Sequence, residues 1–270
     1  MIVTNAFFKD HSAGDIFSFY LIGDLHLGTI FCCEHEIEKY IKLIEEDPLA
    51  YWIGMGDMGE YITPSDKRWD DGVVAKWLHP DNIAEDIRIK LNDIFTPIKG
   101  KCLGMLWGNH ERSFRKFNYG NVHQNLCNDF GVRNLGFSCF IHFKFQRKSS
   151  QSRRLFKGAF THGTGSATTD TAKKKKLLDF MDRTDAHFYG YAHTHACDVS
   201  TKIYLGTNVK KSRLKSLNKV GLLTGCFFKT YGESNEASYG EQKLYAPLPI
   251  GCGVIRVNPH EGTYKGEILI

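Results

Sequence analysis

The chain has 270 residues, of which 42% are hydrophobic and 24% are charged, and its formal net charge is +5. These are ordinary globular values, which exclude wholesale disorder and a fibrous protein, while the mild basic excess permits a phosphate-bearing partner. No apolar run approaches the roughly 18 residues that cross a bilayer, and residues 1–5 lack the features of a secretion signal. We therefore expect a cytoplasmic protein without a membrane partner, whose eight cysteines, none in a C-x-x-C pair, are reduced thiols.

The first half of the chain predicts alternating strands and helices. Apolar runs rich in branched and aromatic residues predict strands, and apolar residues at helical spacing predict helices. In chain order these are a strand at Ile16–Gly23, a helix at Glu34–Glu46, a strand at Tyr51–Met55, a helix at Ile83–Phe95, a strand at Cys102–Trp107 and a helix at Asn121–Phe130. The initial strand–helix–strand order is a βαβ unit, which implies a parallel sheet with a right-handed crossover.

The second half predicts mostly strands. They are expected at Leu135–Phe145, Leu155–Phe160, Ala186–Tyr191, Ile203–Leu205, Val220–Phe228, Gly253–Val257 and Thr263–Leu269, with one helix at about Asp170–Asp182. We expect these strands to form a second sheet packed on the first. No repeat or linker divides the chain, so residues 1–270 are predicted to be a single α/β domain. The polar, irregular segment 60–82 is interpreted as an inserted lid, with a structural brace as the alternative.

Five polar blocks directly follow predicted strands. They are Asp24/His26, Asp57, Asn109/His110, His162 and His193/His195. Ligands of open α/β sheets bind beyond the carboxyl ends of the strands, so we expect the blocks to converge on one crevice. A single block could be a buried histidine or a turn carboxylate, but five by accident are improbable.

The residue types in these blocks suit a metal centre. Imidazole nitrogens with carboxylate and amide oxygens, and no thiolate, favour Mn, Fe or Zn over a structural zinc site of the cysteine type. Seven candidate ligands are too many for one ion and suit two ions that share a carboxylate. Two divalent ions roughly 3.5 to 4 Å apart can hold a bridging hydroxide and stabilise an in-line displacement at phosphorus.

The order D-x-H, G-D, G-N-H-E, H-G and H-x-H resembles the calcineurin-like metallophosphoesterase superfamily, over about Ile16 to Asp198. The resemblance implies a four-layer α/β/β/α sandwich of two mixed β-sheets flanked by helices. It further implies that one metal is held by Asp24, His26 and His195, that the other is held by Asn109, His162 and His193, and that Asp57 bridges them.

The same resemblance implies roles for three residues of the fourth block. His110 would be the non-ligand histidine that stabilises the transition state or protonates the leaving oxygen. Glu111 could orient His110, and Arg112 could contact phosphate, with a solvated surface arginine as the alternative. The chain departs from the family at Glu60, where many members have a second aspartate, and at Ala192, where glycine is usual. Neither departure removes a ligand, so we expect the centre to assemble.

The features that bear on the substrate are less specific than the five blocks. The first block, Asp-Leu-His-Leu-Gly, looks like the DNA-repair nuclease branch and also the lipid A pyrophosphatase branch, and residues 238–251 look like phage and prophage phosphoesterases, which would place the protein in the host cytoplasm. Basic segments occur at Arg147–Arg154, Lys173–Lys176 and Lys210–Lys219, each of which could simply be a solvated face. The four lysines in the first helical turns oppose the helix dipole, and facing a cleft they would form an anion site.

These features lead to one predicted function and two alternatives. We expect a two-metal phosphoesterase, with manganese favoured and iron or zinc open, that hydrolyses phosphodiester bonds in DNA or another nucleic acid. The first alternative is a phosphomonoesterase, nucleotide or pyrophosphate hydrolase acting on a small phosphorylated substrate. The second is a non-catalytic scaffold with the same fold, although a scaffold usually loses ligands and none is missing here. The sequence leaves the oligomeric state open.

Overall fold

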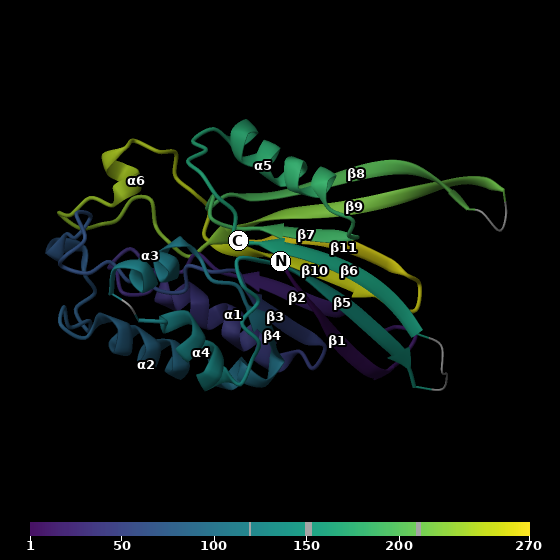
Figure 1. Ribbon diagram of the computed structural model, residues 1–270, viewed down its shortest axis with the longest axis horizontal. Helices are drawn as coiled ribbons and strands as arrows, with labels where there is room; N and C mark the ends of the chain where they lie inside the picture. The colour runs from purple at the N-terminus through teal and green to yellow at the C-terminus, as the bar shows by residue number, and fades with distance from the viewer. Residues whose placement is uncertain (119, 149–152, 209–211) are drawn as a thin grey trace.

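The computed structural model describes residues 1–118, 120–148, 153–208 and 212–270 and has helices on both sides of a large mixed sheet (Figure 1). In hydrogen-bonded order the strands are β1 (Ile2–His11), β5 (Ser138–Arg147), β6 (Arg153–Thr161), β7 (Phe188–Tyr191), β9 (Arg213–Cys226), β10 (Gly251–Asn258), β2 (Phe17–Ile22), β3 (Ala50–Gly54) and β4 (Cys102–Met105). In addition, β8 (Cys197–Asn208) pairs with β9, and β11 (Thr263–Leu269) pairs with β10. The β2–β3–β4 and β6–β7 pairings are parallel, as βαβ connections require, and β9 also pairs with β7 in parallel.

The mixed α/β class is confirmed, while the four-layer sandwich of two mixed sheets stays a prediction. Cys226 and Gly225 of β9 pair with Gly251 and Cys252 of β10, which joins both halves in one hydrogen-bonded path. The halves also exchange strands, because β10 pairs with β2, and β1 pairs with β5. The sequence missed β1 since its side chains are mostly exposed, and its only buried apolar residue is Phe8.

The path of strands curls so that its two halves pack face to face. Phe19 of β2 lies 4.7 Å from Phe143 of β5, measured between ring centroids, in an edge-to-face arrangement. Phe8 of β1 lies 5.4 Å from Phe19, so aromatic side chains of three strands share one buried cluster. Edge-to-face pairs of this kind contribute about 1 kcal/mol beyond the burial of their apolar area. This cluster holds the two halves of the sheet in fixed positions.

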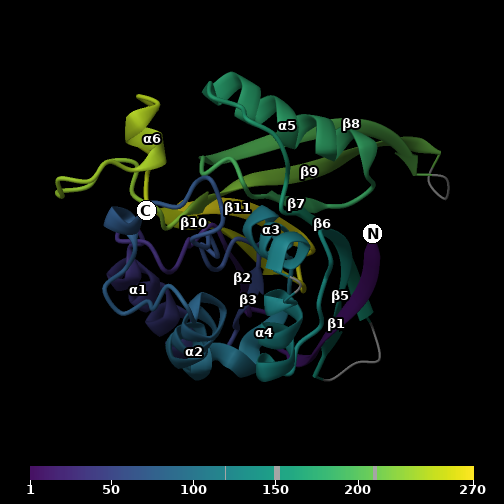
Figure 2. The same ribbon diagram turned by 60° about the vertical axis from the view of Figure 1, so that its left-hand side comes forward.

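Helices cover the outer faces of the sheet (Figures 1 and 2). The β2–β3–β4 half is covered by α1 (Glu34–Glu46), α2 (Ile83–Phe95) and α4 (Val122–Phe130), and the β7–β9 half is covered by α5 (Asp170–Arg183). The helical spacing predicted α1, α2 and α4 closely. Thus α4 is capped at its start by Asn121, whose side chain accepts a hydrogen bond from the Gln124 amide, and at its end by Gly131, whose φ of 65° is left-handed.

Four helical segments were not predicted. They are the 3-10 helices η1 (Asp71–Val73) and η2 (Thr96–Lys101) and the α-helices α3 (Asn109–Asn118) and α6 (Tyr239–Gln242). The sequence gives no sign of α3, because its only buried residues are His110 and Glu111 at its start, so no apolar stripe forms. The segment Lys210–Lys219 also differs from expectation: residues 213–219 belong to β9, and Lys210 and Lys211 lie outside the described residues.

Segment 60–82 is packed against the body of the protein. Tyr61 and Leu78 are buried in the cluster beneath α2, and an isolated bridge joins Val74 to Thr29. These contacts fit the alternative interpretation of segment 60–82 as a structural brace. The role of this segment as a lid stays a prediction, as does the single-domain organisation. None of the described helices combines the length and the hydropathy required to cross a bilayer.

His123 of α4 makes folding stability depend on pH. Burial lowers the pKa of His123 from its ordinary 6.5 to about 4, even though Nε2 lies 3.2 Å from the Met105 carbonyl oxygen. Between these two pH values the unfolded chain binds more protons than the folded one. The free energy of unfolding is therefore expected to fall by about 3 kcal/mol from this group as the pH drops from 6.5 to 4.

Urea unfolding at pH 7 and at pH 4.5 tests this expectation. The variant His123→Gln lacks the titrating ring and should lose less stability on acidification than the unmodified protein. His35→Gln removes an exposed imidazole of α1 and should retain the pH dependence of the unmodified protein. If the free energy of unfolding falls equally on acidification in His123→Gln and His35→Gln, His123 is not the source of the pH dependence.

Candidate metal centre

The five polar blocks lie beyond the ends of five strands, as the sequence predicted, and Asn109 and His110 begin α3 a short distance after β4. Asp24 and His26 follow β2, Asp57 follows β3, Asn109 and His110 follow β4, His162 follows β6, and His193 and His195 follow β7. The side chains of these blocks form adjoining groups. Two of the groups combine carboxylate and imidazole ligand atoms that could hold a metal ion.

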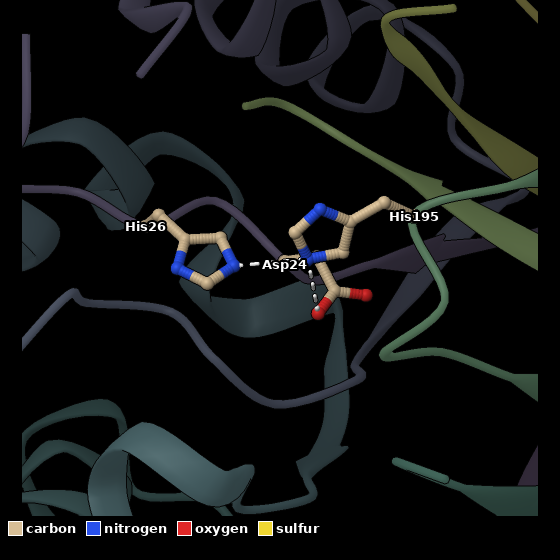
Figure 3. A group of neighbouring side chains, drawn as sticks. All are labelled: Asp24, His26 and His195. Carbon is tan, nitrogen blue, oxygen red and sulfur yellow. Dashed lines mark hydrogen bonds and ion pairs between the residues drawn. The ribbon is translucent and has the colours of Figure 1, made fainter. Parts of the chain in front are cut away.

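Asp24, His26 and His195 form the first group (Figure 3). Their ligand atoms all lie within 4.8 Å of one another; Nε2 of His26 is 3.1 Å from Nε2 of His195, which is 3.6 Å from Oδ1 of Asp24. Oδ1 of Asp24 is buried and accepts no hydrogen bond from any described residue. A buried carboxylate oxygen without a partner is costly, and a cation at this position would satisfy it.

Asp57, His162 and His193 form the second group, with ligand atoms within the same 4.8 Å limit. Nε2 of His162 is 3.3 Å from Oδ2 of Asp57 and 3.1 Å from Oδ1 of Asn109, which places the amide beside this group. The two groups are also connected, because Oδ2 of Asp24 accepts a 2.8 Å hydrogen bond from the backbone N–H of His193. All seven candidate ligands therefore belong to one continuous cluster.

Two histidines are oriented by hydrogen bonds from their other ring nitrogen. Nδ1 of His26 lies 2.6 Å from Oε2 of Glu60, and Nδ1 of His162 lies 2.9 Å from the carbonyl oxygen of Met55. With the proton on Nδ1 in each ring, Nε2 carries its lone pair toward the cluster. Metal-binding histidines are held in this way by carboxylates or carbonyl groups.

The backbone of the cluster is strained. Asp24, His26, Asp57, His193 and His195 have φ between 49° and 67°, and they are five of the nine non-glycine residues with positive φ in the described chain. The left-handed conformation costs such residues about 1 kcal/mol or more each. It persists because surrounding contacts enforce it, as when the amide of Asp24 donates to the carbonyl oxygen of Gly56 at 2.9 Å. Strain of this kind concentrates at functional sites.

Gly108 permits the close approach of two ligand loops. A Cβ atom on Gly108 would collide with Oδ1 and with the backbone nitrogen of Asp57. The same carboxylate oxygen accepts a 2.9 Å hydrogen bond from the backbone N–H of His110. Glycine is therefore needed at position 108 for steric reasons, because any side chain there would push Asp57 out of the cluster.

Glu111 does not orient His110, contrary to the sequence-based expectation. Its buried carboxylate accepts hydrogen bonds from the backbone N–H groups of Asp57 at 3.1 Å, Met58 at 2.8 Å and Gly108 at 2.9 Å. Glu111 thus fixes the loops after β3 and β4 relative to each other. Burial, with the nearby Asp57 carboxylate, raises the pKa of Glu111 to about 7.

Glu60 makes the contacts that were expected of Glu111. Nδ1 of His110 lies 2.5 Å from the carbonyl oxygen of Glu60 and 3.7 Å from its Oε1, while Oε2 of the same carboxylate contacts His26. A signal for this role is present in the sequence, because Glu60 follows Asp57 by three residues in the same polar block.

The charges of the buried side chains favour cations. Burial alone would raise the pKa of Asp57, but His162 and His110 outweigh it and hold that pKa well below its usual range. Burial lowers the pKa of His162 and of His26, but Asp57 and Glu60 reverse this and raise the two values to about 10 and about 9. The buried carboxylates therefore favour positive charge within the cluster. Bound divalent ions would supply such charge.

The remaining predicted residue, Arg112, is exposed on α3 two residues after His110. Its role in contacting phosphate stays a prediction. Of the basic segment Arg147–Arg154, residues 149–152 lie outside the described part of the chain.

Glu60 provides a test of the site that leaves the seven ligands predicted from the sequence in place, although Glu60 also forms a possible metal-holding group with His26 and His110. The variant Glu60→Gln keeps the size of the side chain but removes the charge that makes His26 more basic, so we expect manganese affinity to fall about 10- to 100-fold. Competition with a fluorescent chelator measures this affinity. Glu46→Gln, an exposed substitution on α1, is the matched control. Equal affinity of the two variants would contradict a role for Glu60 in the site.

The chain was compared with known proteins. No family model matches it, and no curated protein matches its sequence. Among solved structures, a predicted phosphoesterase from Streptococcus pneumoniae is 11% identical with a TM-score of 0.36, over 95% of this chain and 100% of that one. GAP50, described as the anchor in the inner membrane complex of Plasmodium, is 12% identical with a TM-score of 0.46, over 94% and 84%.

A third solved structure, the NAD nucleotidase of Haemophilus influenzae, is 11% identical with a TM-score of 0.40, over 95% of this chain and 49% of that one. At TM-scores below 0.5 these similarities do not establish a common fold. The chemistry of the site must therefore be inferred from its own side chains.

Proposed function

We propose that this chain is a metal-dependent phosphoesterase of the calcineurin-like metallophosphoesterase type. The observation that carries the proposal is the pair of adjoining groups, Asp24/His26/His195 and Asp57/His162/His193, in which the buried Oδ1 of Asp24 accepts no hydrogen bond within the described chain. Buried imidazoles and carboxylates at strand ends, held in strained conformations, fit divalent cations and would be a costly way to fill a core.

The donor set fits two cations. Asp24, His26 and His195 would hold one, Asn109, His162 and His193 would hold the other, and Asp57 would bridge them. Support comes from the Nδ1 contacts of His26 and His162, which leave Nε2 of each ring free to bind. Nitrogen and oxygen donors without thiolate suit manganese first, with iron or zinc as the other candidates.

Such a pair of cations supplies Lewis-acid activation of water and neutralises charge at phosphorus. The chain itself supplies His110, whose Nδ1 donates to the Glu60 carbonyl oxygen and whose Nε2 makes no hydrogen bond with the described residues. The side chain of His110 is 10% exposed, and its ring centroid lies 4.8 Å from that of His26. From this position His110 would donate a proton to the leaving oxygen, with the Glu60 carboxylate stabilising the protonated ring.

We further propose that the substrate is a phosphodiester in DNA or another nucleic acid. The net charge of +5 and the lysine-rich start of α5 support an anionic substrate. The test is a panel in which manganese-supplemented protein meets single- and double-stranded DNA, cyclic nucleotides, a phosphomonoester and a nucleotide-sugar pyrophosphate. Cleavage of DNA is expected. Activity confined to the monoester or the pyrophosphate would overturn the nucleic-acid proposal, and inactivity on the whole panel would overturn the phosphoesterase proposal.

A further inference from the structure

The outward-pointing side chains of β1, β5 and β6 form a surface that we call the open face. Along β1 and β5, buried residues such as Phe8 and Phe143 enter the aromatic cluster, and the residues between them point outward. On this outward side Val3 is 55% exposed, Phe7 is 60% exposed, and Leu155 of β6 is 46% exposed. Figure 2 shows β1 and β5 at the outer side of the molecule, apart from α5. The open face therefore keeps large apolar side chains in contact with water.

The strand register aligns these side chains in rows across the three strands. Phe7 lies opposite Lys144, and Lys144 lies opposite Leu155. In a neighbouring row His142 lies opposite Lys157. Nζ of Lys144 is 5.0 Å from the ring centroid of Phe7, which is a cation–π contact. Apolar and cationic side chains thus stand beside each other across the strands of the open face.

The open face is basic and contains no acidic residue. Residues 2–9, 138–147 and 153–161 cover nearly all of the three strands, and they contain six lysines and arginines but no aspartate or glutamate. Lys157 forms an ion pair with Asp185, which lies outside these strands. Lys144 and the exposed Arg153 form no ion pair with a described carboxylate. Their charges therefore remain available to an anionic partner.

This charge decides which kind of partner suits the open face. A second copy of the chain, packed face to face, would bring lysines and arginines together without carboxylates, and opposed like charges are unfavourable. Single-stranded nucleic acid has the complementary charge, and its bases can stack on aromatic side chains while cations contact its phosphates. In a duplex the bases already stack on one another. A single strand therefore matches both the rings and the charges of the open face.

The open face starts near the edge of the sheet where the candidate metal groups lie. Phe140, at that end of the face, lies opposite Ala159, which precedes the candidate ligand His162 by three residues. Three residues of a strand span about 10 Å, and the six residues from Ala159 to Arg153 span about 20 Å. A nucleic-acid strand that is bound at the metal groups could therefore continue along the open face for several nucleotides.

We propose that the open face binds single-stranded nucleic acid, with a base stacked on Phe7 and with phosphates in contact with Lys144 and Arg153. This inference rests on the proposed function, because it concerns a stretch of the same substrate beyond the bond that is cleaved. It narrows the proposed substrate from nucleic acid in general to a single strand.

The test compares Phe7→Leu/Lys144→Gln, the open-face variant, with Phe117→Leu/Lys116→Gln, the α3 variant. In both unmodified pairs a lysine Nζ lies 5.0 Å from the ring centroid of the phenylalanine, so each variant loses one ring and one charge. Phe117 is 63% exposed and lies on α3, outside the open face. Thermal unfolding checks that both variants fold. Phe7→Thr, which suits an exposed strand position, replaces the open-face variant if that variant does not fold.

The affinity for fluorescein-labelled dodecathymidylate is measured by anisotropy in EDTA, so that cleavage does not contribute. The open-face variant is expected to bind about tenfold or more weakly than the unmodified protein, and the α3 variant about as tightly as it. The slope of log affinity against log salt should become shallower by roughly 0.7 for a lost phosphate contact. Equal weakening in both variants, no weakening in either, or tighter binding of a duplex of the same length would overturn the inference.

Sedimentation of the unmodified protein examines the competing occupant, a second copy of the chain. The inference predicts a chain that does not associate through the open face. A dimer that dissociates in the open-face variant, but not in the α3 variant, would assign this face to a second copy and overturn the inference.

A further measurement separates this inference from the proposed function. Bis(p-nitrophenyl) phosphate carries no nucleotide chain that could extend along the open face, so its manganese-dependent hydrolysis should be the same in the unmodified protein and in both variants. Loss of this hydrolysis in the open-face variant alone would show an effect on the metal groups and contradict a separate binding surface. Absence of hydrolysis in the unmodified protein would instead count against the phosphoesterase proposal, whatever the oligonucleotide binding shows.

Discussion

Asp57→Asn is expected to abolish the pairing of two metals and to lower kcat/KM by at least about 10³-fold, since the metals are worth several kcal/mol of transition-state stabilisation. Asp57 is 1% exposed, its Oδ1 accepts the backbone N–H of His110, and its Oδ2 faces Nε2 of His162. Asparagine can keep the first contact. At the second contact asparagine places either an amide nitrogen or an uncharged amide oxygen. A neutral amide cannot bridge two cations.

The control for this substitution is Asp93→Asn, an exposed carboxylate on α2. Both variants lose one negative charge, so a difference between them reports on the position and not on net charge. Metal content and turnover of a small phosphodiester are measured together. Full activity and full metal content in Asp57→Asn would remove the basis for a bridging role.

His110→Ala is expected to keep the metals and to lower kcat about 10²- to 10⁴-fold, the usual contribution of a positioned general acid. The contact of residue 110 with Asp57 is made by the backbone N–H, which alanine retains. Alanine removes the imidazole ring, which Glu60 holds beside His26. The two substitutions therefore separate metal binding from proton transfer.

His260→Ala, an exposed histidine after β10, is the matched control for His110→Ala. The leaving group offers a further readout. A substrate with a good leaving group, such as p-nitrophenolate, needs little protonation, so the loss of kcat in His110→Ala should be smaller with it than with an alkoxide leaving group. An equal loss with both leaving groups would contradict the role of His110 as an acid, and loss of metal from His110→Ala would make it part of the metal-holding structure.

The placement of the site could be predicted from the sequence because it follows from local order. An apolar strand followed at once by a polar residue, as at Asp24 and Asp57, is visible without any knowledge of contacts. Parallel strands then bring their carboxyl ends to one edge, so convergence is a consequence of topology. The helices α1, α2 and α4 were predictable for a similar reason, since their apolar stripes are read directly from spacing.

Features that depend on contacts between distant segments were not predictable. The pairing of β9 with β10 at residues 225–226 and 251–252, which makes the sheet continuous, has no local signature. The contact with His110 that was expected of Glu111 is made by Glu60, because which residue reaches His110 depends on how the loops after β3 and β4 pack. Similarly, the four consecutive lysines of α5 differ in burial and in ion-pair partners. Their spacing in the sequence does not reveal these differences.

The metal content of the purified protein tests the central claim most directly. Protein stripped with a chelator, reloaded with manganese and freed of excess ion is examined by elemental analysis, and hydrolysis of a small phosphodiester is measured on the same sample. The proposed site predicts two ions per chain and activity that appears only on reloading. A chain that retains no divalent ion, or that hydrolyses the phosphodiester equally well when stripped, would contradict the assignment of Asp24, Asp57 and their histidine neighbours as a dinuclear metal centre.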